Sequence, residues 1–256
     1  DAIETCLRSL LATDYPRERM EVLVVDGGSR DGTRAIVERV GREHPCVRVL
    51  GNAAAIAAVG MNIGVRAARG EIVVIAGAHA RYDSSYLRAC VEALERSGAD
   101  CVGGPIEAVS AREGLIPEAI AVALSARFGV GNARFRVSRD EGDMDTVAYG
   151  AYRREVFDRV GLFDERLVRN QDIEFNARLR RAGGRIFMSP TIRSQYYARP
   201  GLAALARQSF ANGKWNVYTL ALTGLSLSWR HFVPMAFVAG LLGSGSAAAV
   251  SPARII

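Results

Sequence analysis

The sequence predicts an α/β fold built on a doubly wound, mostly parallel sheet flanked by helices, and three observations lead to this prediction. Short apolar runs rich in β-branched residues alternate with longer segments in which apolar residues recur with the period of a helix. Glycine, proline or acidic residues separate these segments, which is typical of tight strand–helix corners. The 256 residues are enough for one large hydrophobic core, or for one core with a small appendage.

The first part of the chain, residues 1–104, keeps this alternation regular. Helices are expected where apolar residues repeat every three or four positions, at residues 1–12, 31–43, 53–69 and 84–97. Strands are expected at the β-branched runs between them, at residues 22–25, 47–50, 72–76 and 101–103. The run at 22–25 is apolar throughout, which predicts a strand buried on both faces.

The second part, residues 105–222, continues the domain with a less regular pattern. Helices are expected at residues 114–125, 153–160, 171–182 and 202–222. Strands are expected at residues 146–149, 185–188 and 192–197. The polar, glycine-rich segment 127–145 is too long to be an idle connection, so it is a candidate functional segment.

The stretch 232–250 contains no charged residue and is just long enough to cross a bilayer. Trp229, Arg230 and His231 precede it, as interfacial and positive-inside residues would. We therefore predict a transmembrane segment within residues 229–256. A buried helix of the domain or a re-entrant segment is the alternative.

Charge and cysteine usage exclude several classes of protein. The formal net charge is +6, but the sequence contains no basic stripe interleaved with aromatic residues, which is the pattern that would indicate nucleic-acid binding. The 4 cysteines are scattered singly, without a Cys-x-x-Cys pair. This pattern argues against a disulfide framework or a zinc site and favours reduced thiols in a cytosol-facing protein.

Polar residues gather at the ends of predicted strands and at the start of one predicted helix. Asp26 ends the strand at 22–25, and Gly77-Ala78-His79, the 77–79 corner, follows the strand at 72–76. The third group, residues 170–174, opens a helix. Ligands of open α/β sheets bind at the carboxyl ends of the strands, so the three groups predict a binding site. Each group alone could equally be a helix cap or a hydrogen-bonded histidine.

In this order the motifs resemble family-2 glycosyltransferases with the GT-A fold, and in particular the succinoglycan-type glucosyltransferase branch. The segments that carry the resemblance are residues 24–33, 62–71, 103–105, 127–132, 145–146, 150–157, 161–165, 170–174, Gln208 and 213–215. The resemblance implies a GT-A domain over residues 1–222, Rossmann-like with a mostly parallel sheet, plus a membrane-associated C-terminal helix. Residues 1–104 would form its nucleotide-binding half and residues 105–222 its acceptor-binding half.

The resemblance implies transfer of a sugar from a nucleotide-diphosphate donor to an acceptor hydroxyl with inversion, with Asp172 as the general base. On the donor side it implies Asp26, Gly28, Ser29, Asn62, Gly77 and Ala78. On the acceptor side it implies Glu174, Gln208, Lys214 and Trp215.

Two departures from the family pattern matter. The first strand of the family would lie upstream of Asp1, and the branch's Asp-Ala-His reads Gly77-Ala78-His79 here. His79 is therefore expected to be the remaining protein ligand of a weakened divalent cation, for which imidazole suits Mn²⁺ better than Mg²⁺. The cation would arrive with the donor phosphates, and Arg81, Arg207 or Lys214 would share the charge. The alternative is a catalytically impaired relative that serves as a membrane-tethered donor-binding scaffold.

The resemblance also implies a UDP-sugar donor and a lipid-linked or saccharide acceptor, in exopolysaccharide or cell-envelope glycan synthesis. The protein is expected at the cell membrane, with its catalytic domain in the cytoplasm. A Rossmann dehydrogenase is excluded because no Gly-x-Gly-x-x-Gly follows the strand at 22–25. A nucleotidyltransferase would share the nucleotide-binding half and is not fully excluded by the sequence.

Overall fold

The computed structural model describes residues 2–126, 134–137, 140–199 and 201–224, with short pieces at 232–233, 236–240 and 244. Its helices are α1 (Ala2–Leu11), η1 (Arg17–Arg19), α2 (Thr33–Glu43), α3 (Ala57–Ala67), α4 (Tyr86–Ser97), α5 (Leu115–Ser125), α7 (Arg134–Val137), α8 (Glu155–Val160), α9 (Gln171–Arg181) and α10 (Leu202–Thr223). Its strands are β1 (Val22–Asp26), β2 (Val47–Gly51), β3 (Ile72–Val74), β4 (Ala80–Tyr82), β5 (Cys101–Gly104), β6 (Ile106–Ser110), β7 (Gly142–Asp143), β8 (Ala148–Arg153), β9 (Ile186–Met188) and β10 (Ser194–Ala198).

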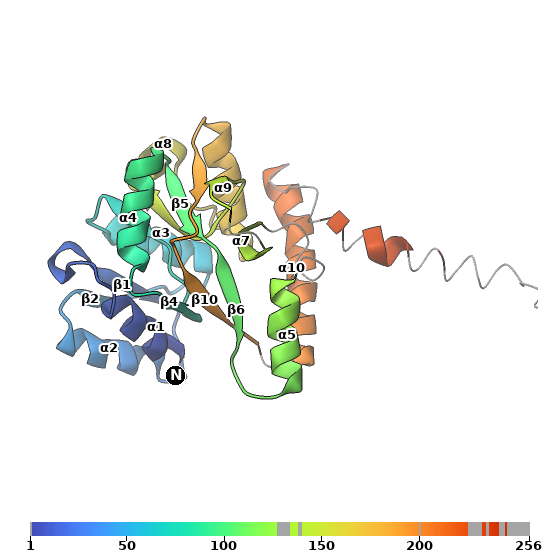
Figure 1. The fold of residues 1–256 in the computed structure, drawn as a ribbon, viewed down its shortest axis with the longest axis horizontal. Helices are drawn as coiled ribbons and strands as arrows, with labels where there is room; N and C mark the ends of the chain where they lie inside the picture. Colours follow the sequence, from blue (N-terminus) through green and yellow to red (C-terminus); the bar gives the residue numbers. More distant parts are fainter. Residues whose placement is uncertain are drawn as a thin grey trace, which may run out of the picture.

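The described strands form three sheets, with helices packed around them (Figure 1). The orders are β1-β2, β4-β10-β6 and β3-β8-β5-β9-β7. Of the seven pairs among these strands, three are parallel and four are antiparallel. The α/β class is confirmed, but the prediction of a mostly parallel sheet is wrong. The cause is chiefly β8, which returns from the second part of the chain and lies antiparallel between β3 and β5.

The main helices are confirmed to within a few residues, but the sequence pattern missed three strands, β4, β6 and the two-residue β7, and misjudged two others. β4 is three residues long with Arg81 at its centre, and β6 turns the charged Glu107 outward, so neither is an apolar run. The strand predicted at residues 146–149 is observed further along the chain, as β8 at Ala148–Arg153. β1 is half-buried along 22–25 rather than buried on both faces, because among the described strands it pairs with β2 alone.

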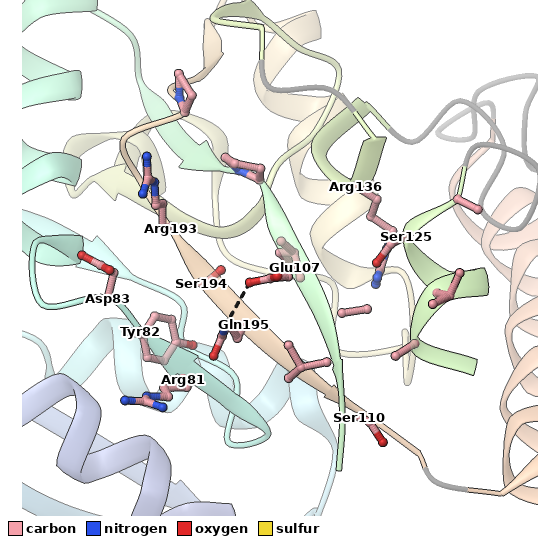
Figure 2. A pocket seen from close by; sticks show the side chains of 18 of the residues that line it. Arg81, Tyr82, Asp83, Glu107, Ser110, Ser125, Arg136, Arg193, Ser194 and Gln195 are labelled. Carbon is pink, nitrogen blue, oxygen red and sulfur yellow. Dashed lines mark hydrogen bonds between the residues drawn. The ribbon is translucent and has the colours of Figure 1, made fainter. Parts of the chain in front are cut away.

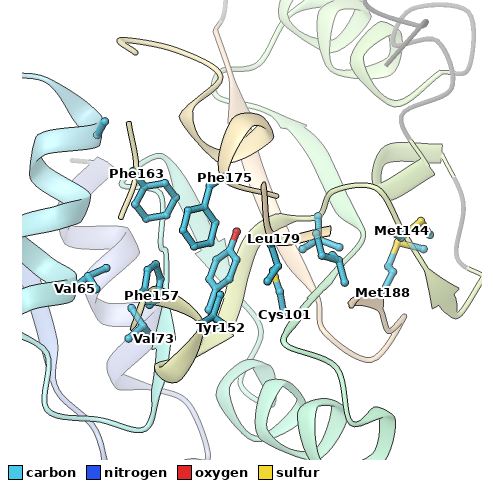
Figure 3. Close-up of a cluster of buried hydrophobic side chains, with 14 residues drawn as sticks. Val65, Val73, Cys101, Met144, Tyr152, Phe157, Phe163, Phe175, Leu179 and Met188 are labelled. Atoms are coloured by element: carbon cyan, nitrogen blue, oxygen red, sulfur yellow. The ribbon is translucent and has the colours of Figure 1, made fainter. Parts of the chain in front are cut away.

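An aromatic cluster at the centre of the largest core holds α9 in place (Figure 3). The ring of Phe175 on α9 lies 4.6 Å from that of Phe163 and 5.4 Å, edge to face, from that of Tyr152 on β8. The Tyr152 hydroxyl donates a 2.9 Å hydrogen bond to Asn176, the next residue of α9. Truncating a buried Phe of this kind costs about 3–5 kcal/mol, so this aromatic packing holds the start of α9 firmly.

No helix in the described parts of the chain is both long and apolar enough to cross a bilayer. The transmembrane segment predicted within 229–256 therefore finds no support there. Most of that segment lies outside the described residues.

Candidate functional site

The first predicted corner holds an ionised carboxylate in a fixed position. Asp26 ends β1 and is 7% exposed, and the backbone N–H of Ser29 lies 3.2 and 3.3 Å from its two carboxylate oxygens. Gly28 has a φ of +84°, which lets the chain fold back over the carboxylate. Hydrogen bonds from the Ser29 side chain and backbone hold the pKa of Asp26 below its ordinary value, against the opposing effect of burial.

Asn52 adds an acceptor beside Asp26. It follows β2, whose last residue pairs with Asp26, and its backbone N–H donates a 2.8 Å hydrogen bond to the Asp26 carbonyl. Its side-chain amide N–H donates to Ile56, but its Oδ1 is buried and accepts no hydrogen bond from the described residues. A buried acceptor without a partner is costly, and a ligand N–H would satisfy it. The sequence could have indicated Asn52 as a candidate binding residue, because it directly follows β2, the strand that is parallel to β1.

The 77–79 corner is closed around Gly77. The backbone N–H of Gly77 donates a 2.7 Å hydrogen bond to the Tyr82 hydroxyl, and the Cys6 thiol lies 3.5 Å from the Gly77 carbonyl. A Cβ built on Gly77 would lie 2.5 Å from Cε1 of Tyr149. Tyr149 itself has a φ of +47°, a left-handed conformation that is uncommon for a bulky residue. The place of a side chain at position 77 is thus taken by the Tyr149 ring.

These residues do not fit a divalent cation held by the protein. Mg²⁺ and Mn²⁺ favour several oxygen ligands, and this corner offers the imidazole of His79 with no carboxylate at position 77. Within the described residues, no three His, Cys, Asp or Glu side chains gather closely enough to hold a metal ion. The metal role predicted for His79 has no supporting ligand set, and we derive no step through a cation.

The third corner places the predicted base beside the predicted acceptor helix. Asp172 lies half-buried in the first turn of α9, two residues after Asn170, which directly precedes that helix and has a φ of +63°. The Asn170 amide donates a 2.9 Å hydrogen bond to Asn216 of α10, and the Arg169 guanidinium donates a 2.9 Å hydrogen bond to Asn212. These contacts fix α10 against the start of α9.

The predicted acceptor residues on α10 differ in position. Gln208 and Trp215 are half-buried and two turns apart, so they lie on one face of the helix. Thr219, one turn further, is buried and accepts a hydrogen bond from Asn170. Lys214 is exposed, and its ammonium lies 5.5 Å from the ring of Tyr218. The structure therefore brings Gln208 and Trp215, but not Lys214, to the face that meets α9.

Asn62 and Glu174 are engaged by structural partners. Asn62 is 1% exposed, and its amide bonds to Phe163 and Glu165 on the loop after α8. Glu174 is 4% exposed and forms two hydrogen bonds, of 2.6 and 2.8 Å, with the Arg178 guanidinium. The ligand contacts predicted for Asn62 and Glu174 are not needed to explain their burial, because these bonds account for it.

Strand β8 connects the second and third corners. Tyr149 packs on Gly77, and Tyr152 lies three residues further along the same strand, about 10 Å away at the rise of a strand. Burial raises the pKa of Tyr152, and electrostatic interactions with Cys101 and Asp172 add to the effect. Asp172 therefore lies within electrostatic reach of the strand that closes the 77–79 corner.

A groove of about 1360 Å³ lies between α5 and the sheet of β4, β10 and β6 (Figure 2). Gln195 donates a 3.0 Å hydrogen bond to Glu107 across its floor. Arg81 lines the groove on β4, and Arg136 reaches it from α7. Arg207, the other arginine expected to share the donor's charge, is exposed on α10.

Sequence reasoning did not single out Arg136. Its Nη1 atom is buried without a hydrogen-bond partner among the described residues. The guanidinium carbon lies 5.8 Å from the centre of the Tyr196 ring. The available signal was the segment 127–145 around it, which is too long and too polar for a simple connection.

Comparison with known proteins adds a family and a fold. The model of the family described as "Glycosyl transferase family 2" matches residues 1–161. The succinoglycan biosynthesis protein ExoA of Rhizobium meliloti is 30% identical over 217 residues, which cover 84% of this chain and 65% of that protein. A Methanococcus voltae dolichyl N-acetyl-alpha-D-glucosaminyl phosphate 3-beta-D-2,3-diacetamido-2,3-dideoxy-beta-D-glucuronosyltransferase is 28% identical over 219 residues, 82% of this chain and 67% of that protein.

Among solved structures, the mannosyltransferase PcManGT of Pyrobaculum calidifontis, in complex with GDP-Man and Mn²⁺, superposes with a TM-score of 0.63. It is 21% identical in sequence, and the match covers 98% of this chain and 77% of that one. This likeness shows the GT-A fold. The chain spans about two thirds of the length of the two sequence relatives, at 67% and 65%.

Proposed function

The chain belongs to glycosyl transferase family 2, a family of transferase enzymes, and from this premise we propose that it moves a sugar from a nucleotide diphosphate to an acceptor hydroxyl with inversion. The observation that carries the proposal is the meeting of α9 and α10. The half-buried carboxylate of Asp172 stands in the first turn of a helix to which the predicted acceptor helix is hydrogen-bonded.

In the proposed reaction the acceptor oxygen forms a bond to the anomeric carbon as the bond from that carbon to the donor phosphate breaks. The hydroxyl proton passes to Asp172, and the electron pair of the broken bond leaves with the nucleoside diphosphate. A single displacement of this kind inverts the anomeric configuration. Asp172 would stand on the acceptor side, opposite the departing diphosphate.

The donor would lie across the carboxyl ends of β1 and β3. Asp26, fixed and ionised at the tip of β1, would accept hydrogen bonds from the nucleoside, and the buried Oδ1 of Asn52 offers a further acceptor beside it. The diphosphate would face the 77–79 corner. We propose a UDP-sugar, following the sequence resemblance, while the GDP-Man complex of PcManGT makes GDP-sugars the comparison to test.

For the acceptor we propose a lipid-linked saccharide at the cytoplasmic face of a membrane, in exopolysaccharide or cell-envelope glycan synthesis. The Methanococcus relative acts, by its name, on a dolichyl-linked sugar phosphate. α10 supports this proposal because it carries exposed apolar side chains along its length: Leu202, Phe210, Val217, Tyr218 and Leu222. Exposed apolar side chains with nearby cations are suited to contact with the surface of an anionic bilayer.

The test is a donor panel with the full chain in membranes, in which UDP- and GDP-sugars carry a labelled sugar. We expect Asp172→Asn to abolish transfer, because the amide cannot take the acceptor proton. Asp158→Asn, which changes an exposed carboxylate on α8, is the matched control and should transfer at the wild-type rate. Full transfer by Asp172→Asn would contradict the assignment of the base. Donor binding without transfer in the wild type would favour the scaffold alternative.

A further inference from the structure

The filled 77–79 corner raises the question of which group stabilises the departing diphosphate. The departing diphosphate carries negative charge. Its two usual partners in enzymes are a divalent cation and the side chain of Arg or Lys. The carboxylate that would hold a cation is absent at Gly77, and the Tyr149 ring fills its place. The chain must therefore bring another positive charge to this corner.

Two described cations lie near this corner, Arg81 on β4 and Arg136 on α7, and Arg136 is the one that is largely buried there. Tyr149 packs on Gly77, and Tyr196 pairs with Ala80, the residue after the corner. The charge of Arg136 interacts with the hydroxyls of both tyrosines, and its guanidinium lies 5.8 Å from the centre of the Tyr196 ring. Arg136 therefore packs on Tyr196, which pairs with the strand that follows the corner, and Arg136 also lines the groove (Figure 2).

One nitrogen of the Arg136 guanidinium lacks a hydrogen-bond partner among the described residues, although the group lies over the rings of Phe135 and Tyr196. This nitrogen, Nη1, is buried and has no hydrogen-bond partner within the part of the chain that the structure describes. Burial accordingly lowers the pKa of Arg136. Holding a charge in this way costs stability, and the cost is offset when an anion binds, since a guanidinium and a phosphate form parallel, charge-assisted hydrogen bonds.

We propose that Arg136 binds the diphosphate of the sugar donor at the 77–79 corner, in place of a cation held by the protein. The inference rests on the function proposed above. The hydroxyl of Tyr149 stands beside it as a second donor. Burial raises the pKa of that hydroxyl to about 12, so it keeps its proton at any working pH.

The test measures nucleotide binding to the full chain by calorimetry in a metal-chelating buffer, with UDP, GDP and the corresponding monophosphates as probes. We expect Arg136→Met to weaken diphosphate binding about ten- to hundredfold, the loss typical of a charge-assisted hydrogen-bonded contact. Monophosphate binding should change much less. Arg136→Lys, which keeps the charge but not the planar fork, should lie between Met and the wild type. Arg180→Ala, on the exposed face of α9, is the matched control.

A second readout separates binding from a purely structural role. Because Nη1 of Arg136 is buried without a hydrogen-bond partner among the described residues, Arg136→Met should melt at the same temperature as the nucleotide-free wild type or higher. A large fall in melting temperature would overturn the proposal by making Arg136 a structural residue.

The remaining outcomes are distinct. Diphosphate binding that requires added Mn²⁺, or that survives Arg136→Met unchanged, would overturn the inference and leave the proposed function standing. An unchanged UDP affinity with a raised KM for a phosphate-linked acceptor would assign Arg136 to the acceptor phosphate instead. A wild type that binds no nucleotide at all would overturn the proposed function together with the inference.

Discussion

Replacing Gly77 with alanine tests whether the Tyr149 ring really fills the place of the missing side chain. The new Cβ would lie 2.5 Å from Cε1 and 3.1 Å from both Cζ and Oη of that ring. The ring would have to move by nearly 1 Å to reach an ordinary contact of 3.4 Å. It is not free to do so, because it packs edge-on against Tyr82 at 5.7 Å and its backbone carbonyl accepts a 2.8 Å hydrogen bond from Tyr86.

The size of the effect follows from this overlap. Overpacking in a well-ordered interior costs about 1–3 kcal/mol. For a protein of this size each kcal/mol shifts the melting temperature by about 2–4 °C, so Gly77→Ala should lower it by about 2–12 °C. Tyr149→Gly removes the ring and also suits the φ of +47° at that position. When Gly77→Ala is added to Tyr149→Gly, the free energy of unfolding should hardly change. The coupling free energy between the two positions should therefore be about 1–3 kcal/mol.

The assay is a double-mutant cycle of four proteins unfolded in urea and followed by circular dichroism. Gly201→Ala is the matched control, because a Cβ there meets open space and the backbone φ is −133°. Equal costs of Gly77→Ala with and without the Tyr149 ring would refute the reasoning. The strain would then come from another neighbour.

Three further predictions concern the pH, the thiols and the buried ion pair. In the folded protein the pKa of Asp26 lies below its ordinary value of 3.8, so its stabilising contribution is complete above pH ~4 and is lost as the pH falls through the lowered value. The urea midpoints of the wild type and Asp26→Asn should therefore converge in acid, and a constant difference would argue against an ionised Asp26. Cys46 is half-buried and should react first with a thiol reagent at pH 8, because burial raises the pKa of the thiols of Cys6, Cys90 and Cys101. Simultaneous labelling of all four cysteines would contradict this prediction. Glu174→Gln should destabilise the protein by about 3 kcal/mol, because it removes the negative charge that pairs with the Arg178 guanidinium, and it should leave the KM for the donor unchanged. A changed KM with normal stability would give Glu174 a role in binding.

The sequence predicted most helices because their apolar periodicity is local, and it failed where long-range pairing decides the structure. β8 inserts between β3 and β5 although it comes from the second part of the chain, and nothing in residues 148–153 shows its direction. β4 and β6 were missed because each places a charged residue, Arg81 or Glu107, on the outward face of a short strand. Strand pairing, not propensity, makes the sheets mixed.

For the candidate site, too, local sequence indicated some residues, whereas residues whose position depends on long-range packing were missed. Asp26 and Asp172 were singled out as candidates because each stands at the end of a strand or the start of a helix, where local sequence is informative. Arg136 and Tyr149 were not found, since their importance depends on packing against Gly77 and Tyr196, which are distant in sequence. The loss of the carboxylate at Gly77 was visible in the sequence, but the ring that occupies its place was not.

The central claim is that Asp172 takes the acceptor proton in a single displacement at the anomeric carbon. The direct measurement is the anomeric configuration of the transferred sugar, read from the proton NMR coupling of the product formed from an α-linked nucleotide-sugar. A β-linked product is the expected result. An α-linked product would show retention and would contradict the role assigned to Asp172.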